Sequence, residues 1–135
     1  MRLEEYARIG GEHGMCIVKT MNIGGKTFKV ADIKQKYMNN IVEAATDCDI
    51  IDRVVLFGSS IGEHCKESSD IDLAIFGKQT PSRALSSKKY ERFVRRLYSY
   101  DNHAQAYDLL YFRTGAVNKN RIMEDIDKGE IVYER

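Results

Sequence analysis

Residues 53–75 read RVVLFGSSIGEHCKESSDIDLAI, in which two short apolar runs flank a polar loop. Both runs have the length and composition of a buried β-strand; Gly58-Ser59 ends the first, and Asp70 and Asp72 open the second. Alternate residues of a strand share a face, so the two aspartates are expected to point the same way, about 6.6 Å apart. Carboxylates at that separation repel by roughly 2–2.5 kcal/mol at an effective dielectric constant near 20. The pattern therefore indicates a cation between them.

The turn after the first run suits a phosphate group. Glycine lets the backbone at position 58 come close to a ligand, and Ser59 adds a hydroxyl at the same turn. A phosphate cradle beside a carboxylate pair is typical of metal-assisted nucleotide chemistry. Oxygen ligands of this kind favour hard, octahedral cations over zinc.

This arrangement resembles the nucleotidyltransferase superfamily related to DNA polymerase β. In that family an apolar strand ends in Gly-Ser or Gly-Gly, a spacer follows, and Asp-x-Asp or Asp-x-Glu lies in a second apolar strand; the spacer here is 60–69. The resemblance is strongest to minimal bacterial and archaeal members, in which a segment similar to 27–33 leads into a helix before the Gly-Ser strand. The likeness covers roughly residues 26–135 and implies a single small α/β domain, with a mixed β-sheet and helices mainly on one face. Residues 1–25 are expected to be an N-terminal extension of the domain.

The resemblance also implies a third carboxylate on the neighbouring strand, which completes the metal site and deprotonates the acceptor hydroxyl. Residues 106–112 are predicted to be a third core strand, and Asp108 is its only charged residue. Because a lone charge is expensive to bury, Asp108 is the candidate; the alternative is an aspartate at a strand edge that faces water. The implied cofactor is Mg²⁺ or Mn²⁺, held by Asp70, Asp72 and Asp108.

The loop after the Gly-Ser turn departs from the family's commonest form. Many members have an Arg directly after Gly-Ser and an Arg-Gly pair soon afterwards, whereas this chain has Ser60 and then Lys66 as the only Lys or Arg of the loop. The expected nucleotide is ATP, bound by Gly58, Ser59, Ser60 and Lys66. Without those arginines, the triphosphate is expected either to be bound more weakly or to be held by Arg53 or Lys66. The altered loop therefore affects the expected affinity for the nucleotide and leaves the predicted metal site unchanged.

Periodicity and turn residues predict the first half of the chain. Gly24-Gly25 indicates the turn of a hairpin within 15–30. Asp32 and Gln35 have the spacing of a capping box at a helix start. The helix that follows is expected to turn one apolar side to the sheet: Ile33, Tyr37, Ile41, Ala44, Ala45 and Cys48.

The second half is predicted in the same way. Thr80-Pro81 indicates the start of a single helix that runs to about Tyr100. Its inward side is expected to be Leu85, Tyr90, Phe93, Val94 and Leu97. Asn118 is expected to cap a last helix, which Gly129 ends. That helix should face inward through Ile122 and Ile126.

Composition limits the classes of protein that need be considered. A chain of 135 residues with 43% hydrophobic and 30% charged residues can bury a core as one domain. The net charge of +1 provides no global field toward nucleic acid or membrane. No apolar run approaches ~18 residues, and the start MRLEE carries acidic residues where a signal peptide has a basic start and an apolar middle. We therefore expect a cytoplasmic protein without membrane contact, whose Cys16, Cys48 and Cys65 are free thiols.

Two further groups have simpler explanations than a site. One predicted helix face is basic, through Lys88, Arg92 and Arg95, with Ser99 on it and Lys89 and Arg96 beside it. Such a stripe can meet RNA, an acidic protein or a triphosphate, but is more often the solvated side of an amphipathic helix. Nucleic-acid binding is therefore not indicated. His64-Cys65 and His103 match no standard zinc spacing and are expected to be surface or loop residues.

Taken with the resemblance, these features predict transfer of a nucleoside monophosphate from an NTP to a hydroxyl, with release of pyrophosphate. Minimal members resemble the antitoxin half of a two-gene module whose partner is a helical HEPN-type ribonuclease, so a partner protein is the expected acceptor. The alternative is a catalytically weak or inactive module that neutralises such a partner by contact alone. The three carboxylates favour the enzyme, and the altered loop favours the binding module. Homo-oligomer formation is left open.

Overall fold

The computed structural model of the protein describes residues 15–116 and 120–135. Helices and strands follow one another in the order β1 (Val18–Ile23), β2 (Lys26–Ala31), α2 (Gln35–Thr46), β3 (Ile51–Phe57), β4 (Ile71–Gly77), α3 (Pro81–Leu85), α4 (Lys88–Ser99), β5 (Tyr107–Arg113), α5 (Arg121–Asp127) and β6 (Glu130–Glu134). This mixture of strands and intervening helices is that of an α/β protein, as the sequence predicts.

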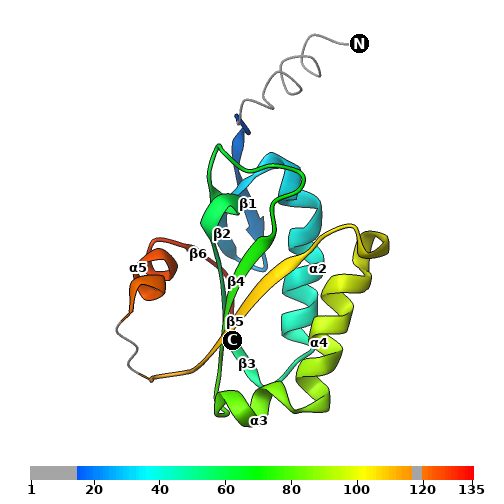
Figure 1. The fold of residues 1–135 in the computed structure, drawn as a ribbon, viewed down its shortest axis with the longest axis vertical. Helices are drawn as coiled ribbons and strands as arrows, with labels where there is room; N and C mark the ends of the chain where they lie inside the picture. Colours follow the sequence, from blue (N-terminus) through cyan, green and yellow to red (C-terminus); the bar gives the residue numbers. More distant parts are fainter. Residues whose placement is uncertain (1–14, 117–119) are drawn as a thin grey trace.

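The central sheet is mixed and has the strand order β5-β4-β3-β6 (Figure 1). Strand β3 pairs antiparallel with β4 and with β6, whereas β4 and β5 run parallel. Strands β1 and β2 form a separate antiparallel pair. The turn of that hairpin is Gly24-Gly25, where φ is +58° and +86°, values that suit glycine in a tight hairpin turn.

The two faces of the sheet are covered unequally. Helices α2 and α4 lie together on one face, and the short α5 lies on the other (Figure 1). Alternate residues of β3 divide accordingly, with Val54 and Leu56 in the core under α2 and α4, and Val55 and Phe57 in a smaller cluster with Ile126 of α5. The predicted placement of helices mainly on one face is therefore confirmed.

The segment predicted as one helix after Pro81 is two helices. α3 ends at Leu85, and α4 begins after Ser87, whose side chain accepts a hydrogen bond from the Tyr90 backbone N–H at 3.1 Å. The break turns Leu85 outward, where it is 58% exposed, so the prediction that Leu85 faces inward is wrong. Tyr90 and Phe93 are buried, as expected.

Two predicted helix caps differ from those observed. Neither the 3₁₀ turn Asp32–Lys34 nor α2 has a side-chain cap hydrogen bond at its start, so the capping box is wrong. Asn118 lies outside the described residues. The observed cap of α5 is Asn120, whose side chain accepts from the Met123 N–H at 3.1 Å.

Two of the three cysteines lie in the protein core. Cys48 and Cys65 are buried free thiols, and burial raises the pKa of both. A raised thiol pKa lowers the thiolate fraction and with it the reactivity.

Through the ranges 15–116 and 120–135, every helix is too short or too polar to span a bilayer.

Candidate active site at the β3, β4 and β5 edge

The Gly58 turn is shaped around an aspartate of the next strand. Strand β3 ends at Phe57, and the chain continues as the 3₁₀ turn Gly58–Ile61. Gly58 has φ +72°, a left-handed conformation that side chains rarely adopt. A Cβ atom at this position would lie 2.1 Å from Oδ2 of Asp72. The glycine is therefore required by the Asp72 carboxylate itself, in addition to the phosphate approach that the sequence suggests.

The sheet places the predicted carboxylates side by side. Asp72 is the partner of Phe57 in the antiparallel β3–β4 pair and of Asp108 in the parallel β4–β5 pair. Neighbouring strands are about 4.8 Å apart, so the two aspartates are adjacent across the ladder. Asp72 shares its face with Ala74, and Asp108 shares its face with Leu110, and both apolar residues belong to the cluster on the α5 side. Asp70 directly precedes β4, which places all three aspartates at one edge of the sheet.

One reason for selecting Asp108 is corrected by the structure. Strand β5 is an edge strand, and Asp108 is exposed, as the alternative of a strand-edge aspartate expects. Its charge therefore carries no large burial cost. What distinguishes Asp108 is its register opposite Asp72, which periodicity alone does not provide.

The electrostatics of the carboxylate group centre on Asp72. This residue is half-buried, and its burial, with the nearby charges of Asp108 and then Asp70, raises its pKa to about 6. Each cause disfavours the charged form. A cation bound close to Asp72 would oppose this effect by favouring the carboxylate.

We expect Asp72 to make the metal-free protein less stable as pH rises from about 4 to about 6. In this window the folded protein holds the Asp72 proton more tightly than the unfolded chain, so raising the pH costs stability. The full shift would correspond to ~3 kcal/mol, and solvent screening at this half-buried site reduces the expected loss to about 1 kcal/mol. Urea unfolding in EDTA at several pH values should show this loss for wild type and not for Asp72→Asn. Parallel pH curves for the two proteins would contradict the assignment.

The three carboxylates have the oxygen ligands that a hard divalent cation prefers, but their side chains are not close enough together to enclose one. They offer oxygen ligands only, and burial, together with repulsion from Asp108 and Asp70, raises the Asp72 pKa. Within 15–116 and 120–135, however, no three His, Cys, Asp or Glu side chains are close enough to form a metal site as they stand. His64 and His103 are exposed, whereas Cys65, in the same loop as His64, is buried. Metal binding at Asp70, Asp72 and Asp108 stays a prediction.

Comparison with protein families decides the relationship of the chain. The family model for Polymerase beta, Nucleotidyltransferase matches residues 39–135, which is more than half of the chain. The chain belongs to this nucleotidyltransferase family. The match includes the Gly58 turn and all three carboxylates, and it begins within α2, after the β1–β2 hairpin. None of the curated proteins compared with the chain matches it.

The four positions predicted to bind nucleotide in this family member differ in their exposure to solvent. Gly58 and Lys66 are exposed and Ser59 is half-buried. Ser60, which we expected to line the nucleotide site, is 0% exposed instead, and its hydroxyl is buried without a hydrogen-bond partner among the described residues. The side chain at the position of the family's Arg is therefore inside the turn.

Arg53 is too far from the Gly58 turn to hold a triphosphate there. Five residues of extended strand separate the two positions, or about 16 Å. The Arg53 guanidinium also has other partners, an ion pair with Glu134 at 3.1 Å and the ring of Phe76, 5.2 Å from its centroid. Lys66 is left as the candidate cation of the loop.

A buried lysine behind this loop was missed by sequence reasoning. Lys34 is 0% exposed, and its ammonium donates hydrogen bonds to the Glu67 and Ser69 carbonyls and to Gln105 Oε1. Burial lowers its pKa, while neighbours that include Cys65, Glu67 and Asp70 act in the opposite direction. A single lysine before a helix has no periodicity or spacing that would reveal such a role.

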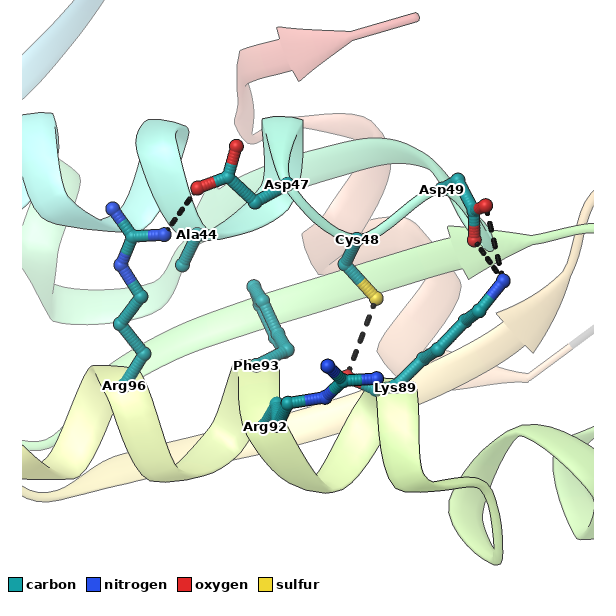
Figure 2. Close-up of a pocket in the computed structure, with 8 residues that line it drawn as sticks. All are labelled: Ala44, Asp47, Cys48, Asp49, Lys89, Arg92, Phe93 and Arg96. Carbon is teal, nitrogen blue, oxygen red and sulfur yellow. Dashed lines mark hydrogen bonds and ion pairs between the residues drawn. The ribbon is translucent and has the colours of Figure 1, made fainter.

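The basic stripe of α4 borders a separate pocket of about 440 Å³ between α2 and α4 (Figure 2). Most of its cations are neutralised: Lys89 pairs with Asp49 at 2.8 Å, and Arg96 pairs with Asp47 and Glu43. Arg92 lies on the same helix between them (Figure 2). The pocket lies near the start of β3, about 20 Å of strand away from the Gly58 turn. This arrangement favours a solvated helix face over a second active site.

Proposed function

We propose that the protein is a metal-dependent nucleotidyltransferase that moves a nucleoside monophosphate from an NTP, expected to be ATP, to a hydroxyl acceptor. The observation that carries the proposal is the pairing of Asp72 with Asp108, beside a glycine turn in which a Cβ atom would meet the Asp72 carboxylate. Membership of the nucleotidyltransferase family supports the same reaction class. The minimal, antitoxin-like subgroup and its HEPN-type partner belong to this proposal.

The proposed roles follow from exposure and position. Asp70, Asp72 and Asp108 would hold Mg²⁺ or Mn²⁺, and the ion would stabilise negative charge on the reacting phosphate. Asp108 is exposed on the edge strand, so an acceptor hydroxyl reaches it from solvent. Its carboxylate would take the hydroxyl proton as the oxygen–phosphorus bond forms and the bond to pyrophosphate breaks. The Gly58 turn and Ser59 would hold the phosphates, with Lys66 as the nearby cation.

A second candidate is a non-catalytic module that binds a partner protein. The specific observations in its favour are the buried Ser60 at the position of the family's Arg, and carboxylates that are not gathered around a metal position in the described residues. The burial of Asp72 beside the charges of Asp108 and Asp70, which raises its pKa, favours the enzyme, because such perturbed carboxylates are typical of functional sites.

Metal binding can be measured without knowing the acceptor. Mg²⁺ is expected to raise the melting temperature of the wild-type protein, since a ligand at 100 times its Kd stabilises the folded state by about 2.7 kcal/mol. Asp72→Asn should remove this rise and leave the metal-free protein as stable as wild type or slightly more stable. Asp49→Asn is the matched control, since this exposed carboxylate pairs with Lys89 beyond the other end of β3. Equal metal shifts in all three proteins would contradict the site.

A further inference from the structure

The Lys34 ammonium occupies a fully buried site made only of acceptors. It lies 3.1 Å from the Glu67 carbonyl, 2.7 Å from the Ser69 carbonyl and 2.7 Å from Gln105 Oε1. A lysine ammonium has three donors, so these contacts use its full capacity. Ion pairs within the described ranges do not include Lys34, which makes it a buried positive charge held by neutral oxygens.

These acceptors lie on the two segments that deliver the carboxylates. Ser69 directly precedes Asp70, and Gln105 lies three residues before Asp108. The Gln105 amide donates to the Ser69 carbonyl at 3.0 Å and to the Ala106 carbonyl at 2.7 Å. The Ile71 N–H also donates to the Ala106 carbonyl, at 3.0 Å. Lys34 and Gln105 together therefore tie the start of β4 to the start of β5.

The lysine comes from a part of the chain that precedes the family match at residue 39. It ends the 3₁₀ turn that follows the β1–β2 hairpin, whose residues Phe28 and Val30 are buried in the core. The hairpin lies beside the loop between β3 and β4 (Figure 1). Cys16, ahead of the hairpin, donates its backbone N–H to the Glu63 carbonyl of that loop. The segment from Cys16 to Lys34 thus packs against the loop between β3 and β4 and is hydrogen-bonded to it.

We infer that Lys34 is the positioning residue of the proposed site, holding Asp70 and Asp108 in the relative arrangement that metal binding and transfer require. The inference rests on the proposed function. The ammonium fixes the chain on both sides through directional hydrogen bonds, and its positive charge interacts favourably with the Asp70 carboxylate. Lys34 is buried, so it acts through these groups and does not touch the substrate.

The alternative is that Lys34 only stabilises the fold. Arg135 provides a matched control, because its guanidinium also donates to backbone carbonyls, those of Ile51, Ala45, Thr46 and Cys48. Arg135 lies at the other end of β3, away from the carboxylates. Arg135→Met and Lys34→Met therefore both remove a cation bound to backbone carbonyls, and only Lys34→Met removes one that adjoins the proposed site.

The test compares wild type, Lys34→Met, Arg135→Met and Gln105→Leu in three measurements: Mg²⁺ affinity by calorimetry, kcat and KM for transfer from labelled ATP, and hydrogen exchange of the 66–71 and 105–108 amides. Lys34→Met should weaken Mg²⁺ binding at least ~10-fold and lower kcat by up to ~10²-fold with less change in KM, the scale expected for misplaced groups. Both amide segments should exchange faster. Because Arg135 lies far from the carboxylates, Arg135→Met should stay within about twofold of wild type in Mg²⁺ affinity, in transfer kinetics and in amide exchange of these segments.

The possible outcomes distinguish a failure of the proposed function from a failure of the role inferred for Lys34. A wild type that neither binds Mg²⁺ nor transfers label contradicts the proposed function. In that case the hydrogen exchange of the two segments in Lys34→Met still tests whether Lys34 holds the starts of β4 and β5 together. An active wild type with equal Mg²⁺ affinity and kcat in Lys34→Met and Arg135→Met contradicts the inference alone. If Lys34→Met does not fold, Gln105→Leu decides, because it removes the bridge to Ala106 while leaving Lys34 two carbonyl acceptors; unchanged Mg²⁺ affinity and kcat there would overturn the inference.

Discussion

Asp108→Ala is expected to lower the rate of nucleotidyl transfer at least ~10²-fold, the usual contribution of a general base. Asp108 is exposed on the edge strand, opposite Asp72 in the β4–β5 register, so an acceptor can approach it from solvent. Nucleotide binding at the Gly58 turn should survive in part, because Asp70 and Asp72 are unchanged. The measurement is the initial rate of label transfer from ATP at saturating Mg²⁺.

Two variants make the Asp108 result specific. Asp49→Ala removes an exposed carboxylate far from the site and should leave the rate unchanged. The charge reversal Arg92→Glu with Arg95→Glu alters the α4 face, so it can affect capture of an acceptor but should leave metal-induced stabilisation intact. Transfer that is unaffected by Asp108→Ala would remove Asp108 from the mechanism.

Gly58→Ala is expected to abolish measurable binding of Mg²⁺ with a non-hydrolysable ATP analogue. Its Cβ atom would occupy a position 2.1 Å from Oδ2 of Asp72, so the carboxylate must swing away from the turn. The displaced atom is the end of a flexible side chain, and the fold should therefore survive. The added cost of φ +72° for alanine is ~1–2 kcal/mol.

Gly24→Ala is the matched control for Gly58→Ala. Gly24 also has positive φ, +58°, but a Cβ there would meet no atom within 4 Å. The two variants should therefore lose similar stability in urea unfolding, and only Gly58→Ala should lose binding in calorimetry. Equal binding by a folded Gly58→Ala protein would move the nucleotide site elsewhere.

Local patterns were sufficient to predict the strands and the position of the acidic pair. Apolar runs of strand length between turn residues identify β3, β4 and β5, and Asp70 and Asp72 gain their meaning from the Gly58 turn that precedes them. The Gly24-Gly25 hairpin has a similarly local cause. These features depend on neighbours in sequence, which is why the sequence reveals them.

Features that depend on tertiary contacts were missed or misplaced. Lys34 has its role only because the chain brings Ser69 and Gln105 to it from 35 and 71 residues away. The exposure of Asp108 depends on β5 being an edge strand, which a strand pattern does not specify. The break between α3 and α4 is a local choice that the apolar repeat concealed, because Ser87 caps a new helix within a continuous amphipathic pattern.

The most direct test of nucleotidyl transfer compares ATP labelled at the α-phosphate with ATP labelled at the γ-phosphate. Each is incubated with the protein, Mg²⁺ and the product of the neighbouring gene as acceptor, followed by gel autoradiography. Transfer of a nucleoside monophosphate predicts Mg²⁺-dependent label on the acceptor from α-labelled ATP and none from γ-labelled ATP, with the signal lost in Asp108→Ala. An acceptor that stays unlabelled by both, yet is neutralised equally by wild type and Asp108→Ala, would contradict the enzyme and leave the binding module.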